Sequence, residues 1–309
     1  MYLSLKLECS LLKQNVPNIL WFCVDQMRYD AINALGNKHI NTPRINELIR
    51  EGVALRNCYV QNQLCTPSRA SFLTGRYPAA HQVYRNGNAF FPKSEVLITK
   101  LLSDAGYDCG LVGKLHLSSA SKFEKRPDDG YRFFEWCQNP SWEKVPNSNS
   151  YWRWLREKKN QDPISLFNKN KKYLKVGIPA EFHQLTWCTE TAISFINQKR
   201  EGPWMLSVNP FDPHPPFDPP PEFLKKYNPK NLPPPLFKKS DILRQQQFSN
   251  VRSQKLRSVN PVLDYNSKWK VKDNGDEGTG SRPPEHFDGL AIKAAYYAMI
   301  ENIDHQFGL

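Results

Sequence analysis

The 309-residue sequence contains no long hydrophobic run. The longest apolar stretch near its start, Ile19–Val24, has the length of one buried strand, far below the about 20 residues that cross a bilayer. Residues 1–17 also lack the basic start, long apolar centre and small-residue cleavage site of a signal peptide. We therefore expect no membrane span. These features favour a cytoplasmic location and leave export open.

Cysteines are few and scattered. The chain has seven, an odd number, and they form neither a CxxC pair nor a zinc-finger spacing. The sequence also lacks an Asn-x-Ser/Thr acceptor for glycosylation. The cysteine pattern argues against a disulfide framework and favours a reducing compartment.

Acidic residues are outnumbered, 30 against 42 Lys and Arg, which gives a formal charge of +12. This balance predicts attraction to anions such as nucleic acid, acidic polysaccharide or small acidic esters, although a solvated basic surface explains it equally well. The basic residues are dispersed and no nucleic-acid reading motif is present, so we expect no nucleic-acid partner.

The first half of the chain alternates short apolar strands with amphipathic helices. We predict strands at 18–25, 54–60 and 107–114. We predict helices at 42–53 and 94–105, which end at Gly52 and Gly106. This alternation implies the α/β class, with a mixed, mostly parallel sheet flanked by helices.

The second half is less regular. Residues 121–180 and 224–285 show little periodicity, so we predict irregular insertions there. Between and after them we expect a helix near 182–197, a strand at 204–209 and a final amphipathic helix. We therefore divide the chain into an N-terminal extension, 1–16, and one α/β domain, 17–309.

The segment "LCTPSRASFLTGRYP", residues 64–78, contains the residue that matters most for function. Cys65 could be a buried filler, a disulfide half, a metal ligand or a nucleophile. A helix that starts near Pro67 would place Cys65 at a helix N-terminus, where free N–H groups favour anions. Arg69 follows one helical turn later.

Other polar residues follow predicted strands. Asp25 ends the first strand, a position where α/β proteins place their sites, although it could be a simple cap. Lys114 and His116 lie two residues apart at a strand end, so strand alternation would point both side chains the same way. His214 lies on a proline-stiffened loop, and its ordinary pKa of about 6.5 suits proton transfer. An ion pair, a core histidine and a loop histidine without a role are the alternatives.

The pattern Cys65-Thr-Pro-Ser-Arg69, followed by "LTGR" at 73–76, resembles the signature of the type I sulfatases. Further blocks resemble that family in the same order along the chain. They are "PNILWFCVDQMRYDAINALG", "TPRINELIREGV", "GYDCGLVGKLHL", "PWMLSVNPFDPHPPFDPP" and "YYAMIENIDHQFG".

The resemblance implies an alkaline-phosphatase-like fold and a sulfuric-ester hydrolase acting on a sulfated small molecule or glycan. It also implies that a separate maturation enzyme oxidises Cys65 to formylglycine, whose hydrate attacks sulfur. A divalent cation, calcium first and manganese second, would be bound by Asp25, Gln26 and residue 65. Arg69 and Lys114 would stabilise charge, and His116 and His214 would move protons. Arg85 and Asn86 could approach the substrate.

Two departures from the family pattern limit this expectation. Gln26 stands where many members have a second aspartate, and Asp-Gln also occurs in phosphonate and phosphodiester hydrolases of the superfamily. The family's later metal ligands and a further lysine would lie beyond Leu309, since Asp304-His305 belongs to the final helix. We therefore expect a C-terminally truncated sulfatase domain with weak or no activity. Non-catalytic anion binding is the remaining alternative.

Overall fold

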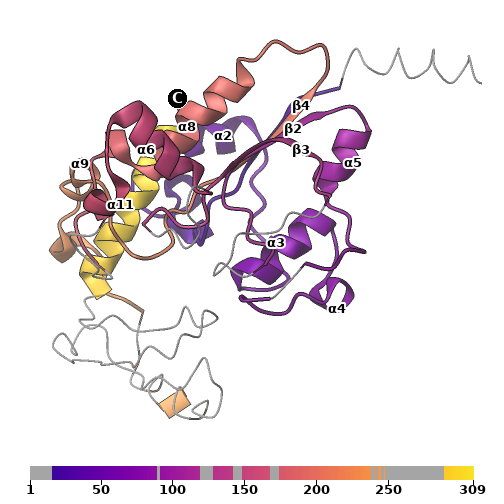
Figure 1. Cartoon of the computed structure of the whole chain (residues 1–309). Helices are drawn as coiled ribbons and strands as arrows, with labels where there is room; N and C mark the ends of the chain where they lie inside the picture. Colours follow the sequence, from indigo (N-terminus) through magenta and orange to yellow (C-terminus); the bar gives the residue numbers. More distant parts are fainter. Residues whose placement is uncertain are drawn as a thin grey trace, which may run out of the picture. The chain divides into compact units, whose positions relative to one another are not determined.

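The computed structural model describes residues 16–88, 91–118, 128–141, 148–167, 174–236 and 289–309, with a few positions between 238 and 247 (Figure 1). The chain divides into two compact units. The first contains the residues up to Val24, Tyr59–Trp154 and Trp187–Phe211. The second contains Asp25–Cys58, Leu155–Thr186 and the residues from Asp212.

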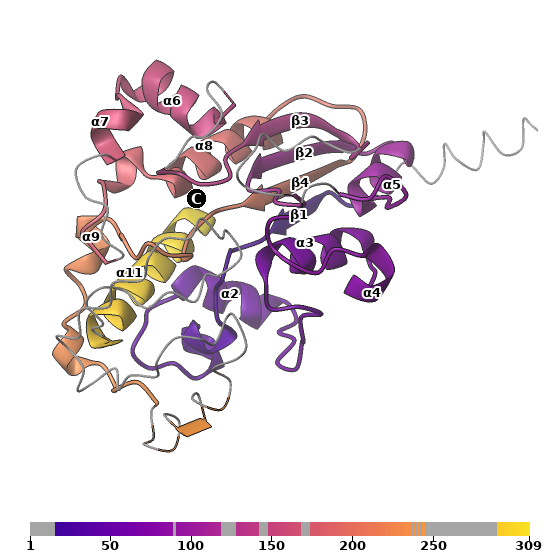
Figure 2. The ribbon, with the colours of Figure 1, turned by 60° about the horizontal axis from the view of Figure 1, so that its bottom comes forward.

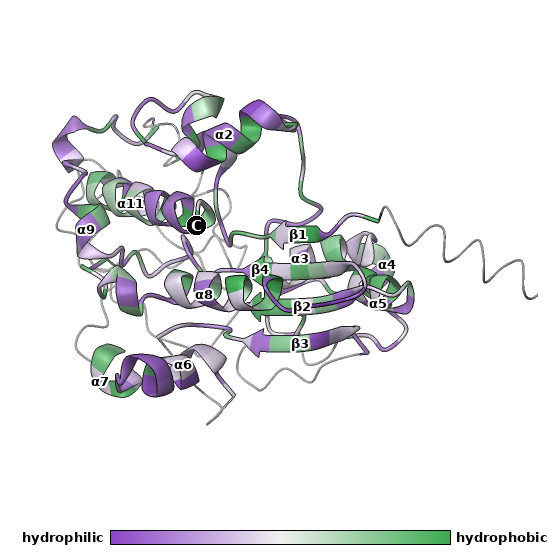
Figure 3. Cartoon of the chain, turned by 90° about the horizontal axis from the view of Figure 1, so that it is seen from above, coloured by the Kyte–Doolittle hydropathy of each residue, from purple (hydrophilic) through white to green (hydrophobic). Residues whose placement is uncertain are grey.

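The first unit is built on a four-stranded sheet in the order β1-β4-β2-β3, in which each neighbouring pair is parallel (Figure 3). The strands are β1 (Ile19–Phe22), β2 (Asp108–Gly113), β3 (Tyr131–Trp136) and β4 (Trp204–Asn209). The carboxyl ends of the four strands therefore lie at one edge of the sheet. This confirms the predicted α/β class with a mainly parallel sheet.

Helices cover both faces of this sheet, which is why β2 and β4 consist mostly of apolar and small residues. The helices that begin in this unit are α3 (Cys65–Thr74), α4 (Pro78–His81), α5 (Ile98–Asp104) and α6 (Ser150–Lys159). Ala70 and Leu73 of α3 belong to one buried cluster with Leu111 of β2. Figure 2 shows α3 and α4 beneath the strands and α5 beside the right-hand ends of the strands.

The opposite face of the sheet packs against α8 (Gln184–Ile196). Phe195 of α8 is fully buried, and its ring centroid lies 5.2 Å from that of Phe133 in β3. A Cβ at Gly110 of β2 would lie 2.8 Å from the Phe195 ring, so only glycine fits beneath that ring. The helix therefore approaches the sheet closely at this point.

The second unit is mainly helical. Its helices are α2 (Pro43–Glu51), α7 (Pro163–Phe167), α9 (Pro221–Leu224) and α11 (Gly289–Phe307). Short 3-10 turns are η1 (Tyr29–Ala31), η2 (Asn33–Leu35), η3 (Ala180–Phe182) and η4 (Pro229–Asn231). Among the residues described, none of the helices is long and apolar enough to span a lipid bilayer.

Most predicted elements are confirmed, and two predictions are wrong. The predicted strand at 54–60 is an exposed loop, in which Leu55 and Tyr59 are 74% and 81% exposed. The predicted insertion at 121–180 contains β3, which pairs with β2, and the helices α6 and α7. Most of 224–285 and nearly all of 1–16 lie outside the described residues, so those predictions stay untested.

Candidate active site

Cys65 is the first residue of α3 and is half-buried. The turn before it is fixed by side chains: Asn62 Oδ1 accepts from the Leu64 N–H at 2.8 Å, and Asn86 Oδ1 accepts from the Thr66 N–H at 2.9 Å. Pro67 has no N–H. The Ser68 N–H donates to the Leu64 oxygen at 3.0 Å, so few N–H groups of this helix start remain to favour an anion. The helix terminus thus contributes less than the sequence suggested, and Asn86 positions the helix start.

Arg69 connects α3 to the end of β2. It is 3% exposed, and its Nη1 donates to the backbone oxygen of Lys114 at 2.9 Å. The Lys114 N–H donates in turn to the Asn209 oxygen at the end of β4, also at 2.9 Å. The main chain at Lys114 is thus held by the helix that carries Cys65 and by the neighbouring strand. Two of the predicted charge-stabilising residues, Arg69 and Lys114, are brought together.

The Lys114 ammonium group is buried against an aromatic ring. Lys114 is 2% exposed, and its Nζ lies 5.3 Å from the centroid of the Phe211 ring. A cation removed from bulk water in this way attracts anions much more strongly than a hydrated surface lysine does. Phe211 was not identified from the sequence, since a single aromatic residue carries no signal for such a contact.

His116 is buried at 5% exposure, close in sequence to Lys114. β2 ends at Gly113, and His116 has φ +57°, in the left-handed region. Strand alternation therefore does not continue to His116. It no longer supports the prediction that the side chains of Lys114 and His116 point the same way. Holding histidine in this backbone conformation costs about 1–3 kcal/mol, a type of strain that concentrates at functional sites.

Asp25 and His214, both in the second unit, form a pair. Asp25 is 6% exposed, and the possible ligand atoms of the two residues lie within 4.8 Å of one another. His214 Nδ1 lies 2.7 Å from the Pro215 carbonyl oxygen, which can only accept. Nδ1 must therefore carry the hydrogen, and in the neutral ring Nε2 has the lone pair. The pair offers one oxygen and one nitrogen to a cation.

Gln26 is exposed and has φ +64°. The Tyr296 hydroxyl donates to the Gln26 backbone oxygen at 2.9 Å and accepts from the Arg28 N–H at 2.8 Å. Burial raises the pKa of Tyr296 to about 12, so its hydroxyl keeps the proton that it donates. Tyr296 therefore holds the turn after Asp25, and its separation of 270 residues from Gln26 hides this contact in the sequence.

The buried residues His183 and Asp212 precede His214 in the second unit. His183 Nε2 and Asp212 Oδ2 are 3.6 Å apart. Burial lowers the pKa of His183 to about 4 and raises that of Asp212 well above its ordinary value. Near neutral pH His183 is therefore uncharged, which suits a structural role.

Asp304 and His305 lie within α11, as predicted. The two carboxylate oxygens of Asp304 accept from the backbone N–H groups of Arg44, at 3.3 Å, and Ile45, at 2.8 Å. These two residues form the first turn of α2, and Thr42 before them makes no side-chain capping bond. Asp304 thus supplies the cap of α2 from another helix.

The strand topology explains why candidate residues that are far apart in the sequence follow strand ends at one edge of the sheet. Lys114 directly follows β2, Asp25 comes three residues after β1, and His214 comes five residues after β4. Because β1, β4 and β2 are parallel neighbours, all three segments leave the carboxyl edge of the sheet. Open α/β sheets bind ligands at this edge.

The model of the sulfatase family matches residues 17–308. The chain belongs to the sulfatase family. The chain is 28% identical over 304 residues to an arylsulfatase of Clostridium perfringens, and the match covers 94% of the chain and 58% of the relative. It is 40% identical over 111 residues to mouse steryl-sulfatase, covering 33% of the chain and 18% of the relative. The chain therefore spans little more than half of the relative matched along most of its length.

Solved structures share the fold of this chain. The phosphonate monoester hydrolase of Agrobacterium radiobacter aligns over 95% of the chain and 58% of its own length, with TM-score 0.68 and 21% identity. A protein solved with its substrate D-glucosamine-2-N,6-O-disulfate aligns over 95% and 61%, with TM-score 0.58 and 19% identity. At these identities the likeness concerns the fold, and it confirms the expected alkaline-phosphatase-like architecture.

Proposed function

We propose that this chain carries the nucleophile of a sulfuric-ester hydrolase. The observation that carries the proposal is the connection from α3 to β2, in which Arg69 binds the main chain of Lys114 one helical turn after Cys65. Family membership supports the chemistry assigned to residue 65. Residue 65 is cysteine in the structure, so its Sγ stands for the hydroxyl of a hydrated formylglycine. That hydrate supplies an oxygen nucleophile and a second hydroxyl through which sulfate is later released.

The other residues would neutralise and move charge. Lys114 binds a sulfate oxygen, because its buried ammonium group favours an anion, and Arg69 positions both Lys114 and the start of α3. His116 takes a proton during sulfate release. His214 either gives a proton to the departing alcohol or binds the cation. Its neutral ring has one lone pair, so it does not do both at once.

A divalent cation fits the Asp25 and His214 pair. One ion at about 2.1–2.5 Å from each ligand atom can span the 4.8 Å limit between those atoms. We propose Gln26 and residue 65 as further ligands on the strength of family membership. When bound, the ion would acidify the attacking hydroxyl and polarise the sulfate group. The carboxylate suits calcium, whereas an imidazole ligand favours manganese.

A sulfated small molecule or glycan is the proposed substrate. The solved relative in complex with its substrate, a disulfated glucosamine, supports this class. Phosphonate or phosphodiester hydrolysis is the second candidate. It is favoured by the neutral Gln26 and by the likeness to phosphonate monoester hydrolases. Turnover of an aryl sulfate against phenyl phosphonate separates the two candidates.

The experiment on residue 65 combines mass spectrometry with binding. The chain is produced with and without a formylglycine-generating enzyme, and the peptide that contains residue 65 is weighed. With the enzyme present, we expect an aldehyde in place of the thiol of residue 65. In the aldehyde form, Lys114→Ala should weaken aryl-sulfate binding at least tenfold, which is a loss of about 1.4 kcal/mol of binding free energy. Lys100→Ala, at a partly exposed lysine of α5 that pairs with Asp104, is the control. A peptide that keeps its thiol under both conditions would contradict the proposal.

The cation proposal is tested by isothermal titration with calcium and manganese. Asp25→Ala should abolish binding, and Gln26→Asp should tighten calcium binding about tenfold because a charged oxygen replaces a neutral one. His214→Ala should weaken manganese more than calcium. Equal affinities in wild type, Asp25→Ala and Gln26→Asp would remove both residues from the site.

A further inference from the structure

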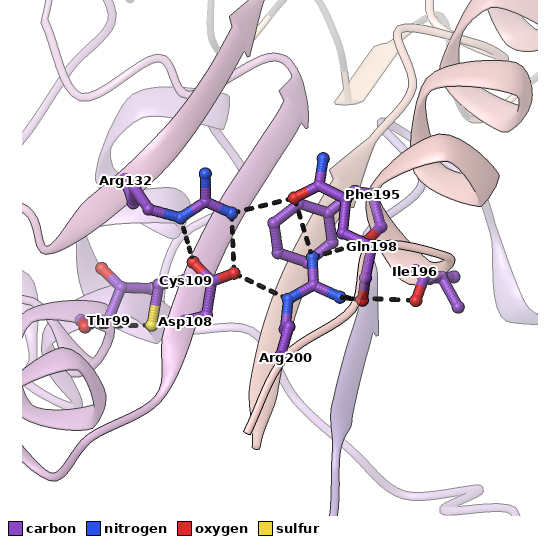
Figure 4. Close-up of polar contacts among 8 residues, drawn as sticks. All are labelled: Thr99, Asp108, Cys109, Arg132, Phe195, Ile196, Gln198 and Arg200. Atoms are coloured by element: carbon purple, nitrogen blue, oxygen red, sulfur yellow. Dashed lines mark hydrogen bonds and ion pairs between the residues drawn. The ribbon is translucent and has the colours of Figure 1, made fainter. Parts of the chain in front are cut away.

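Asp108, the first residue of β2, is bound by two arginines at the amino edge of the sheet. Its carboxylate accepts from Arg132 Nε at 2.5 Å and Nη2 at 2.7 Å, and from Arg200 Nε at 2.7 Å (Figure 4). The hydrogen bond from Arg132 lowers the pKa of Asp108 most, and Arg200 adds to this effect. The carboxylate therefore stays ionised and holds the two guanidinium groups side by side.

Arg200 has little freedom to move. Its guanidinium donates to the backbone oxygens of Phe195, at 2.5 Å, and Gln198, at 3.0 Å. It also lies 4.1 Å from the centre of the Phe195 ring, and its side chain is 9% exposed. Arg200 thus closes the carboxyl end of α8 and fixes the base of the cluster.

Gln198 is oriented by these arginines. Its Oε1 accepts from Arg132 Nη2 at 3.1 Å and from Arg200 Nη2 at 3.3 Å. A guanidinium group only donates, so the atom that faces it must be the amide oxygen, and the amide NH2 must point the other way. Figure 4 shows this NH2 and the second terminal nitrogen of Arg132 directed to the same side. Two donor groups are therefore held on the same side of the cluster.

A pocket of about 450 Å³ lies at this cluster, which is within the size range of small-molecule sites. Lys199, Gly106 and Gly202 also line it. The lining includes three basic residues, Arg132, Lys199 and Arg200, and one carboxylate, that of Asp108, so it carries two positive charges in excess. Such a lining favours an anion.

We propose that this pocket binds a small molecule with a sulfate-like oxyanion, held by the terminal nitrogens of Arg132 and the amide NH2 of Gln198. The pocket is separate from the proposed active site, because Asp108 and Lys114 lie at opposite ends of β2, about 20 Å apart at 3.3 Å per residue. The inference therefore does not depend on the hydrolase proposal.

The test follows the side-chain signals of Gln198 and the arginine Nε–H groups by NMR during titration with sodium sulfate. Sodium chloride at matched ionic strength is the reference. We expect a saturable shift of the Gln198 NH2 signal with sulfate alone, unchanged in Lys114→Ala. A sulfated monosaccharide is titrated in parallel: tighter binding than inorganic sulfate identifies an organic ligand, and equal binding identifies the free anion.

Gln198→Glu is the decisive variant. It keeps an oxygen for both arginines but replaces the NH2 donor with a second acceptor, so sulfate binding, read from Arg132 Nε–H, should weaken at least tenfold. Gln161→Glu, in the second unit, makes the same change of charge and should have no effect. Shifts that rise linearly with sulfate, or equal affinity in Gln198→Glu and wild type, would overturn the proposal.

Discussion

Removing the Asp304 carboxylate should destabilise α2 without weakening cation binding. The residue precedes His305, and this Asp-His pair has the residue types of a metal site. The structure instead directs both carboxylate oxygens to the backbone N–H groups of Arg44 and Ile45. Asp304 is 2% exposed, so the contact is shielded from solvent.

The size of the effect follows from the contact. Loss of a helix N-cap costs about 0.5–2 kcal/mol, and a buried negative charge near a helix N-terminus lies at the upper end of that range. Both N–H groups belong to the partly exposed first turn of α2, so water can replace the carboxylate in part. We therefore expect Asp304→Ala to lower the free energy of unfolding by about 2 kcal/mol. Asp304→Asn keeps one acceptor oxygen and should cost about half as much.

The assay is urea unfolding followed by circular dichroism, combined with calcium titration of the same variants. His305→Ala is the matched control at the neighbouring exposed position, and its effect should stay within about 0.5 kcal/mol. The reasoning fails if Asp304→Ala unfolds at the wild-type urea concentration while calcium affinity falls tenfold. That result would make Asp304 a ligand rather than a cap.

Two further predictions concern backbone space and pH. Gly113→Ala should cost about 4 kcal/mol in urea unfolding, because its Cβ would lie 2.1 Å from the Asn209 oxygen at φ +107°. Gly36→Ala, at φ +113° with open space, should cost only about 1–2 kcal/mol, and equal losses would refute the steric argument. Burial raises the pKa of Asp218 from 3.8 to about 6, so its contribution is present below pH 3.8 and is lost as pH rises through 6. The free energy of unfolding should therefore fall by up to about 3 kcal/mol as pH rises, and Asp218→Asn should remove this fall. The same pH profile of unfolding in wild type and Asp218→Asn would contradict the prediction.

Local signals predicted most elements of the fold. Pro43 and Gly52 bound α2 as expected, and the apolar run at 204–209 is β4. Both predictions are correct because the residues that start, end and bury such an element lie within a few positions of one another in the sequence. The prediction of a strand at 54–60 was wrong because strand formation does not depend on local sequence alone. Its apolar residues suit a strand, but a strand also needs a neighbour, which its own sequence does not specify.

The sequence predicted candidate site residues, but it did not predict the contacts that support them. Cys65, Arg69 and Lys114 were proposed because they stand in a recognisable motif or block. The bond from Arg69 to the Lys114 main chain and the hold of Tyr296 on Gln26 were not predictable. Such contacts depend on where separate segments meet in space, and a single sequence does not record that. β3 was missed because its charged residues at 132 and 135 interrupt the apolar pattern.

The left-handed backbone at Gln26 and His116 has a consequence for large-scale mutagenesis. Valine and isoleucine fit this conformation poorly, whereas glycine and asparagine enter it readily. A library of all substitutions would therefore be depleted at both sites for reasons of chain geometry, whatever the side chains do. Glycine at either position, or asparagine at position 116, is the informative comparison, because it keeps the turn and removes the original functional group.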